Sequence, residues 1–147
     1  MKVSDILAEK NRKLIAIAPE TRIRRAVTIM AAEHVGALVI ENLDGRLLGV
    51  VSEHGVVDGL ARHGGHLLEM SVHEIMVADG PTVSPDDSVV VAMRLMTERR
   101  ARHLPVVAGA ALVGLISVGD VLKSRLAEKT EEVSVLQDIA RFRLAAA

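Results

Sequence analysis

Ser117 and Asp120 stand three positions apart at the end of an apolar segment, where a hydroxyl and a carboxylate can act together. Residues 114–121 read Gly-Leu-Ile-Ser-Val-Gly-Asp-Val, a pattern that predicts a buried strand running into a helix start. Unpaired N–H groups at such a start suit a phosphate near Ser117 and Gly119. The Asp120 carboxylate can accept hydrogen bonds from the vicinal hydroxyls of a ribose. Taken alone, these residue types favour helix capping over ligand binding.

The same pattern occurs a second time, 65 positions earlier, with Ser52 in the place of Ser117. Residues 49–56 read Gly-Val-Val-Ser-Glu-His-Gly-Val, so Gly55 stands where the second copy has Asp120. The likeness extends outward and pairs Pro19 with Pro85, Ala26 with Ala92, Met30 with Met96 and Leu38 with Leu104. Repetition over most of the chain predicts two copies of one unit that share a core, and it favours ligand binding over capping alone.

With both copies in view, the chain resembles a tandem pair of cystathionine-β-synthase (CBS) domains, like those of stand-alone CBS-domain proteins. The resemblance implies an α/β (α+β) fold of two repeated β-α-β-β-α units packed as a pseudo-twofold pair, with a C-terminal helical extension. The predicted boundaries are residues 1–65 for the first repeat, 66–127 for the second and 128–147 for the helical tail. The first repeat departs from the family motif at Gly55, where an aspartate is expected.

Periodicity and turn residues predict the elements that position these groups. Ser4 and Ser71 are predicted to cap short helices, and Pro19 and Pro85 to open longer ones. Short strands are expected at residues 14–17 and 82–84, a polar loop at 11–13, and hairpins at 37–52 and 103–117.

The tail can form one helix from residue 119 to about 144, or two helices if Thr130 caps a second one. An apolar stripe on it consists of Leu126, Val133, Leu136 and Ala140, interrupted by Lys129.

The family resemblance also implies where a nucleotide would lie. Ser117 and Gly119 would hold its phosphate and Asp120 its ribose, while its base would contact Thr82 and Val83, with Leu104 and Pro105 opposite. In the first repeat, Ser52 would face a weaker or altered site, because Gly55 cannot accept a ribose hydroxyl. Asp58, one turn on, is a substitute for the missing carboxylate, although a solvent-facing position is favoured for it.

A basic cluster precedes the second hairpin and consists of Arg99, Arg100, Arg102 and His103. One interpretation is a solvated helix end whose cations complement the helix dipole. The other is a phosphate contact, for which Arg102 and His103 are the candidates because a guanidinium matches phosphate geometry.

Composition excludes several classes of function. The 147 residues carry a net charge of −1, no cysteine and one aromatic residue, which argues against nucleic-acid partners, disulfides and zinc–cysteine sites. The pair His63 and His66 lacks a third ligand, so a surface linker is favoured over a metal site. No apolar run reaches the length of a membrane span and no signal peptide is recognisable, so no membrane contact and a cytoplasmic location are expected. No catalytic motif occurs, so the chain is not expected to be an enzyme.

The sequence therefore predicts a ligand-sensing module that binds an adenine nucleotide in the cleft between its repeats. AMP is the first choice, and ATP, ADP and NAD(H) are alternatives. Because the 147 residues contain no effector domain, the energy-sensing output is expected to act on an unknown regulated partner, and the resemblance implies a homodimer. The competing hypotheses are a structural or oligomerisation module without a ligand and, less favoured, an enzyme acting on nucleotides.

Overall fold

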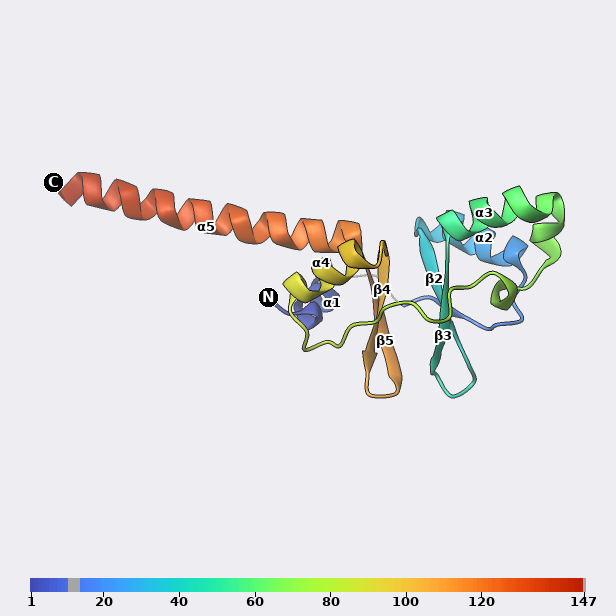
Figure 1. Ribbon diagram of the computed structural model, residues 1–147. Coiled ribbons are helices and arrows are strands. Elements are labelled where there is room, and N and C mark those ends of the chain that lie inside the picture. The colour runs from blue at the N-terminus through green and yellow to red at the C-terminus, as the bar shows by residue number, and fades with distance from the viewer. Residues whose placement is uncertain (11–13, 147) are drawn as a thin grey trace.

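The computed structural model describes residues 1–10 and 14–146, and helices and short strands alternate along them. The loop expected at residues 11–13 lies outside the described residues. In chain order the elements are α1 (Val3–Glu9), β1 (Ala16–Ile17), α2 (Ile23–Glu33), β2 (Ala37–Glu41), β3 (Leu47–Ser52), α3 (Glu53–His63), the 3-10 helices η1 (Gly64–Glu69) and η2 (Val72–Glu74), α4 (Val89–Glu98), β4 (His103–Ala108), β5 (Ala111–Ser117) and α5 (Val118–Ala146). Figure 1 shows two hairpins side by side, each with its helices on the outer side, and α5 running away from them.

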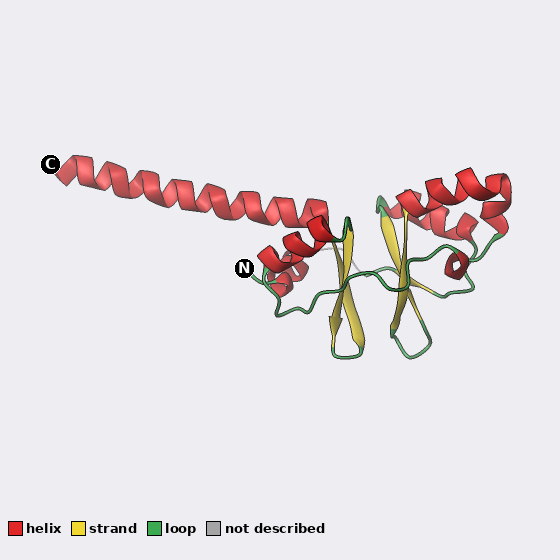
Figure 2. Cartoon of the chain, viewed as in Figure 1, coloured by secondary structure: helices red, strands yellow, loops and turns green. Residues whose placement is uncertain are grey.

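Each repeat contributes one small sheet, as the hairpin predictions require. In the first sheet β1 is parallel to β2, and β2 is antiparallel to β3 with Leu38 opposite Val51. The second sheet pairs β4 with β5 antiparallel, with Leu104 opposite Ile116. In Figure 2 these strands form the centre of the body between two groups of helices. The mixed α/β architecture expected from the repeat is confirmed.

The strand expected at residues 82–84 is wrong in extent, because it is reduced to one parallel bridge between Val83 and Val106. Hydrogen bonds on either side of Val83 hold it there, from its N–H to the carbonyl of Pro105 (3.0 Å) and from the Val107 N–H to its carbonyl (2.8 Å). At the next residue, the N–H of Ser84 donates to the Asp87 carboxylate at 2.8 Å. This contact turns the chain and ends the pairing with β4.

The two repeats exchange their first short helices. Val3 and Ile6 of α1 are buried in a core formed by α4, β4, β5 and the start of α5. Leu67 and Val72, from the start of the second repeat, are buried in the core around α2, β2 and β3. Each core therefore contains residues from both repeats, which ties the repeats into one unit although each is small.

The start of α1 differs from its prediction. Ser4 lies inside the first turn, and Lys2 occupies the N-cap position. The N–H groups of Val3 and Ser4 donate to the carbonyls of Asp87 and Pro85, both at 2.9 Å. These donors are satisfied by the second repeat, so a serine cap is not needed.

The prolines do not open the long helices directly. Helix α4 begins at Val89, and the Ser88 hydroxyl caps it by accepting from Val91 N–H at 3.2 Å. Helix α2 begins at Ile23, after a turn that includes Pro19. In both cases the residues that follow the proline form a turn, so these two predicted starts are wrong by a few residues. Elsewhere the predicted cap Ser71 is confirmed, although only the short η2 follows it.

The tail is a single helix, α5, which decides between the two alternatives left open by the sequence. The Thr130 hydroxyl donates to the carbonyl of Leu126 at 2.9 Å, one turn back, instead of capping a new helix. The buried residues of α5 are Val121 and Ser124, both close to the start of the helix.

Gly49 of β3 is a position where a larger residue should disturb the packing of the two repeats. A Cβ added there would lie 2.8 Å from the carbonyl oxygen of Val77 and 2.8 Å from the sulfur of Met76. Val77 also exchanges two backbone hydrogen bonds with Val50, at 2.9 and 3.1 Å, so the carbonyl cannot retreat freely. We expect Gly49→Ala to lower the free energy of unfolding by about 1–3 kcal/mol in urea titrations.

Gly114→Ala is the matched control, because Gly114 holds the equivalent position in β5. A Cβ there would meet the flexible end of the Leu7 side chain at 2.6 Å instead of backbone. A loss as large for Gly114→Ala as for Gly49→Ala would contradict this explanation.

Candidate ligand-binding clefts

Asp120 closes a reciprocal cap at the start of α5. The N–H of Asp120 donates to the Ser117 hydroxyl at 3.1 Å, and the N–H of Ser117 donates to the Asp120 carboxylate at 2.9 Å. Both residues lie at the junction of β5 and α5, as the strand-to-helix pattern predicts. The capping role that the sequence raised as an alternative is therefore present.

A second contact to Asp120 was not predicted. The ammonium of Lys10, just after α1, donates to the same carboxylate oxygen at 2.8 Å and to the carbonyl of Leu115 at 2.8 Å. The two side chains are 24% and 26% exposed, so this ion pair is largely shielded from water. The exchange of the short helices brings Lys10 here from 110 positions away.

The Asp120 cleft is a cavity of about 260 Å³ in which Asp120 and Ser117 are the motif residues. One wall comes from Lys10, Leu14 and Ile15 before β1, and another from the connection between α2 and β2. The full lining is Leu7, Lys10, Leu14, Ile15, His34, Val35, Gly36, Ala37, His103, Val113, Gly114, Leu115, Ser117 and Asp120. The cleft thus combines a carboxylate, a hydroxyl and an ammonium with aliphatic side chains.

The Ser52 cleft is larger, about 1020 Å³, and lies at the equivalent junction of β3 and α3. The Ser52 hydroxyl accepts from Gly55 N–H at 3.2 Å, which caps α3. The opposite wall is made by residues 77, 78, 80 and 81 and by the arginines between α4 and β4. A Cβ added to Gly55 would meet only the Ser52 hydroxyl, at 3.6 Å, so this position has room for a side chain.

A pseudo-twofold relation between the clefts is visible in the backbone. The N–H of Glu53 donates to the carbonyl of Gly36 at 3.0 Å, and the N–H of Val118 donates to the carbonyl of Arg102 at 2.9 Å. Gly36 and Arg102 are therefore equivalent positions, as are the starts of α3 and α5. Each motif serine faces a wall from the other repeat.

The structure divides the predicted site residues between these two clefts. Ser117 and Asp120 line the Asp120 cleft, whereas Ser52, Arg102 and Pro105 line the Ser52 cleft. Apart from His103, the others line neither cleft: Thr82 and Gly119 are exposed, and Val83 and Leu104 are buried in the second core. The role of these four residues as ligand contacts stays a prediction. The predicted site residues therefore do not all face one common cavity.

His103 begins β4 and lines both clefts. A Cβ built on Gly36 would lie 3.4 Å from its ring nitrogen and 3.6 Å from the Glu53 carboxyl carbon, so these groups meet above Gly36. His103 therefore stands at the boundary between the clefts, which sequence spacing alone does not reveal.

The basic cluster contributes its three arginines to the Ser52 cleft. Arg99, Arg100 and Arg102 are exposed and form no ion pair within the described residues. The equivalent connection of the first repeat supplies no arginine to the Asp120 cleft. The two clefts thus differ in chemistry: the Asp120 cleft pairs a carboxylate with an ammonium, whereas the Ser52 cleft combines guanidinium groups with the Glu53 carboxylate.

The electrostatics of Asp120 favour its ionised form. Burial by itself would raise the pKa of Asp120. The hydrogen bonds from Lys10 and Ser117, together with the Lys10 charge, outweigh burial and hold the pKa below its usual value. Asp120 is therefore an ionised acceptor at neutral pH.

His103 is held neutral by its surroundings. Burial is the largest cause that lowers the pKa of His103, and the charges of Lys10 and Arg102 add to it, against the opposing effect of Asp120 and Glu53. The folded pKa lies below the unfolded value of about 6.5. Between these two values the unfolded chain binds a proton that the folded chain does not, so acidification favours unfolding.

We therefore expect His103 to make the protein less stable as the pH falls through about 6.5 toward the folded pKa. His103→Gln should flatten this part of the curve when the free energy of unfolding is measured against pH. His63→Gln, at the exposed end of α3, is the control. Equal slopes for wild type and His103→Gln would contradict the assignment.

Neither a metal-binding cluster nor a membrane-spanning helix occurs among residues 1–10 and 14–146. Over these ranges no group of three or more His, Asp or Glu side chains is arranged to hold a metal ion. Over the same ranges no helix combines the length and apolar character needed to cross a membrane.

Comparison with known proteins gives a consistent result. A family model described as CBS domain matches residues 3–62 and 72–127. The "Uncharacterized 33.4 kDa protein in ribosomal RNA operon" of Thermofilum pendens is 39% identical over 100 residues, which are 68% of this chain and 32% of that protein. The chain thus spans about a third of that relative's length.

Two solved structures cover most of the chain. A CBS-domain containing protein from Agrobacterium tumefaciens is 33% identical with a TM-score of 0.81, over 85% of this chain and 99% of that one. A CBS domain protein from Pyrobaculum aerophilum, complexed with AMP, is 28% identical with a TM-score of 0.73, over 82% and 89% of the two chains.

Proposed function

The chain belongs to the CBS-domain family, and we propose that it is a non-catalytic sensor that binds an adenine nucleotide between its two repeats. AMP is the preferred ligand, with ATP, ADP or NAD(H) as alternatives. The single observation that carries the proposal is the ionised, anchored carboxylate of Asp120 inside a cleft with a helix start and aliphatic walls. The AMP complex of the related Pyrobaculum aerophilum protein supports the choice of AMP.

Asp120 suits a ribose because its carboxylate is oriented before any ligand arrives. Both of its hydrogen bonds within the described residues use the same oxygen, Oδ2, so Oδ1 is left to accept from a ligand hydroxyl. Ionised acceptors form the stronger class of hydrogen bond, and the shielded position increases their strength. Lys10 must yield or share this carboxylate when a ribose binds.

The remaining groups of the Asp120 cleft match the other parts of a nucleotide. The aliphatic side chains of Ile15, Val35 and Leu115 offer a surface for a base, and the described lining contains no Phe, Tyr or Trp. The ammonium of Lys10 and the start of α5 beside Ser117 are the groups that can hold a phosphate.

We propose a second, altered site in the Ser52 cleft. Its arginines suit the phosphates of a ligand, whereas Gly55 offers no carboxylate for a ribose. Of the predicted phosphate contacts, Arg102 belongs with this cleft and His103 borders both. Occupancy of the two sites would differ, and the difference in affinity between conformations or assemblies would drive regulation of a partner. A homodimer is the assembly that the proposal includes.

The experiment that tests the proposal is identification of a bound nucleotide. Because the chain lacks tryptophan and tyrosine, its own near-ultraviolet absorbance is very low, so a 260 nm peak in denatured, nucleic-acid-free protein reports a co-purified nucleotide. We expect mass spectrometry of that extract to identify an adenine nucleotide, and calorimetry to detect AMP binding to the emptied protein. Absence of both signals would favour a structural or oligomerisation module, and conversion of the nucleotide during incubation would favour an enzyme.

A further inference from the structure

The outer part of α5 carries a strip of side chains that is complementary to itself. Glu132, Leu136, Ile139 and Arg143 follow one another at spacings of 4, 3 and 4 residues, which aligns them along one side of a helix. We propose that this strip pairs antiparallel with the same strip of a second copy of the chain. The inference names a contact for the homodimer of the proposed function, but it rests on the α5 strip and not on nucleotide binding.

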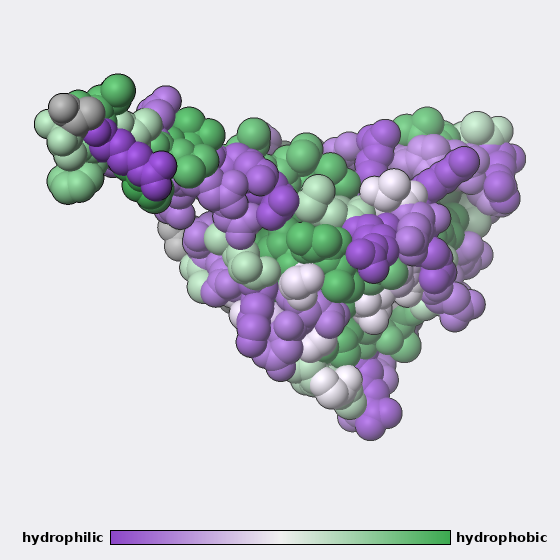
Figure 3. Space-filling view, turned by 60° about the vertical axis from the view of Figure 1, so that its left-hand side comes forward, coloured by the Kyte–Doolittle hydropathy of each residue, from purple (hydrophilic) through white to green (hydrophobic). Residues whose placement is uncertain are grey.

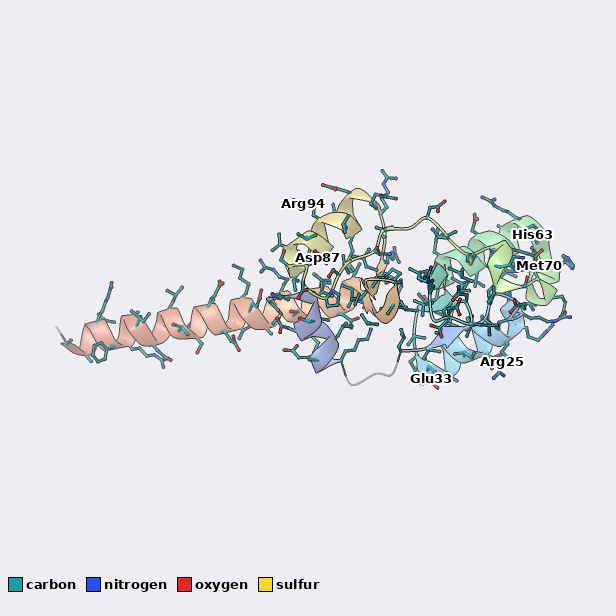
Figure 4. All side chains as sticks on the ribbon, turned by 90° about the horizontal axis from the view of Figure 1, so that it is seen from below. Arg25, Glu33, His63, Met70, Asp87 and Arg94 are labelled. Atoms are coloured by element: carbon teal, nitrogen blue, oxygen red, sulfur yellow. The ribbon has the colours of Figure 1, made fainter. Side chains whose placement is uncertain are left out.

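This part of α5 has no neighbour within the described residues. The buried residues of α5, Val121 and Ser124, lie in its first two turns, and the second family match ends at residue 127. Figure 4 shows the outer side chains projecting from the helix with no other element beside them. Most helical stability in proteins comes from packing of an apolar face, so this segment of about 20 residues calls for a partner.

Apolar side chains surround the strip. Leu136 is 64% exposed, Ile139 46% and Phe142 76%, values that are costly for large apolar groups in an unpaired helix. Figure 3 shows hydrophobic surface along the outer tail, interleaved with hydrophilic groups. Between residues 133 and 146 the polar side chains other than Arg143 gather on the opposite side of the helix, and they are Ser134, Gln137, Asp138 and Arg141. The segment is therefore amphipathic, although the whole helix is not.

The charges favour a second copy of the chain as the partner of the strip, in an antiparallel orientation. In an antiparallel pair centred between residues 137 and 138, Leu136 lies opposite Ile139 of the second copy, and Glu132 lies opposite Arg143. The twofold axis repeats each contact, so the centre is apolar and both ends carry opposite charges. A parallel pair would place Glu132 against Glu132 and Arg143 against Arg143, which is repulsive.

The existing partner of Glu132 does not prevent this pairing. Lys129 contacts Glu132 at 3.1 Å within the same helix, but the two side chains are 61% and 62% exposed. Exposed ion pairs contribute little, so Glu132 can exchange Lys129 for an arginine at an apolar interface. Arg143 forms no ion pair in the described part of the chain.

Disulfide trapping tests the orientation, because the chain contains no cysteine of its own. Glu132→Cys and Arg143→Cys are made as two separate full-length variants, distinguished by mass, and oxidised alone and mixed. We expect a covalent dimer only in the mixture, since equal positions lie 11 residues or about 16 Å apart along antiparallel helices, beyond disulfide reach. Dimers of a single variant would overturn the antiparallel pairing, and a lack of any covalent dimer would overturn the pairing itself.

Charge reversal tests the strip in the non-covalent assembly, without disulfide cross-links. We expect Arg143→Glu to weaken self-association by roughly 5- to 30-fold in sedimentation experiments, and the double variant Glu132→Arg with Arg143→Glu to restore it. Arg141→Glu, the same change on the polar side of the helix, is the matched control. Equal losses for the two arginines, or failure of the double variant to recover, would overturn the proposal.

Discussion

Replacing Asp120 by alanine is expected to weaken AMP binding by roughly 10- to 100-fold. Hydrogen bonds to an ionised acceptor are worth about 1.5–3 kcal/mol, and this carboxylate is the group offered to the ribose. Its low pKa, held down by Lys10 and the Ser117 N–H against the effect of burial, keeps the acceptor ionised at neutral pH. The loss should appear in calorimetric titration of AMP, with stoichiometry unchanged at the Ser52 cleft.

Two further variants separate the ribose contact from other consequences of the Asp120 change. Asp58→Ala removes an aspartate from α3 that pairs with Arg62 at 3.2 Å and lines neither cleft, so its AMP affinity should match wild type. Lys10→Met removes the competing ion pair and a proposed phosphate contact but leaves the carboxylate, so a loss as large as that of Asp120→Ala would assign the effect to Lys10. Unchanged affinity in Asp120→Ala would remove Asp120 from the site.

Supplying the missing carboxylate should create or strengthen binding in the Ser52 cleft. We expect Gly55→Asp to add a second AMP binding event, or to tighten an existing one by about 10-fold, because one charge-assisted hydrogen bond is worth about 1.5 kcal/mol or more. The structure permits the change, since a Cβ at Gly55 meets only the Ser52 hydroxyl, at 3.6 Å. The new carboxylate would stand at the position equivalent to Asp120, one turn into α3.

Gly55→Ala is the matched control for this gain. It adds the same Cβ without a charge and raises helix propensity more than aspartate does, so it should stabilise α3 without changing AMP affinity. Calorimetry of both variants distinguishes the two effects. If stoichiometry and affinity of Gly55→Asp equal those of Gly55→Ala, the missing aspartate does not explain the difference between the clefts.

Local features of this protein followed from the sequence by itself. The repeated Ser-containing motif predicted both strand-to-helix junctions, and the observed hydrogen bonds at Ser52 and Ser117 are those of helix caps. Hairpins, long helices and the helical tail were likewise predictable, because apolar periodicity and turn residues act over a few positions. Helix starts near Ser4, Pro19 and Pro85 were misplaced where backbone contacts from a distant segment or a turn replaced the expected cap.

Only the tertiary structure decided how the local elements combine into sites. The exchange of short helices carries Lys10 to Asp120, and the pseudo-twofold packing assigns Ser117 and Arg102 to different clefts. Sequence spacing could not predict this division of residues between the clefts. Spacing gives the order of residues along the chain, but not which repeat lines the cleft beside each motif serine. That choice depends on the burial of Val3 and Leu67 in the opposite repeat's core, a long-range packing energy with no local signature.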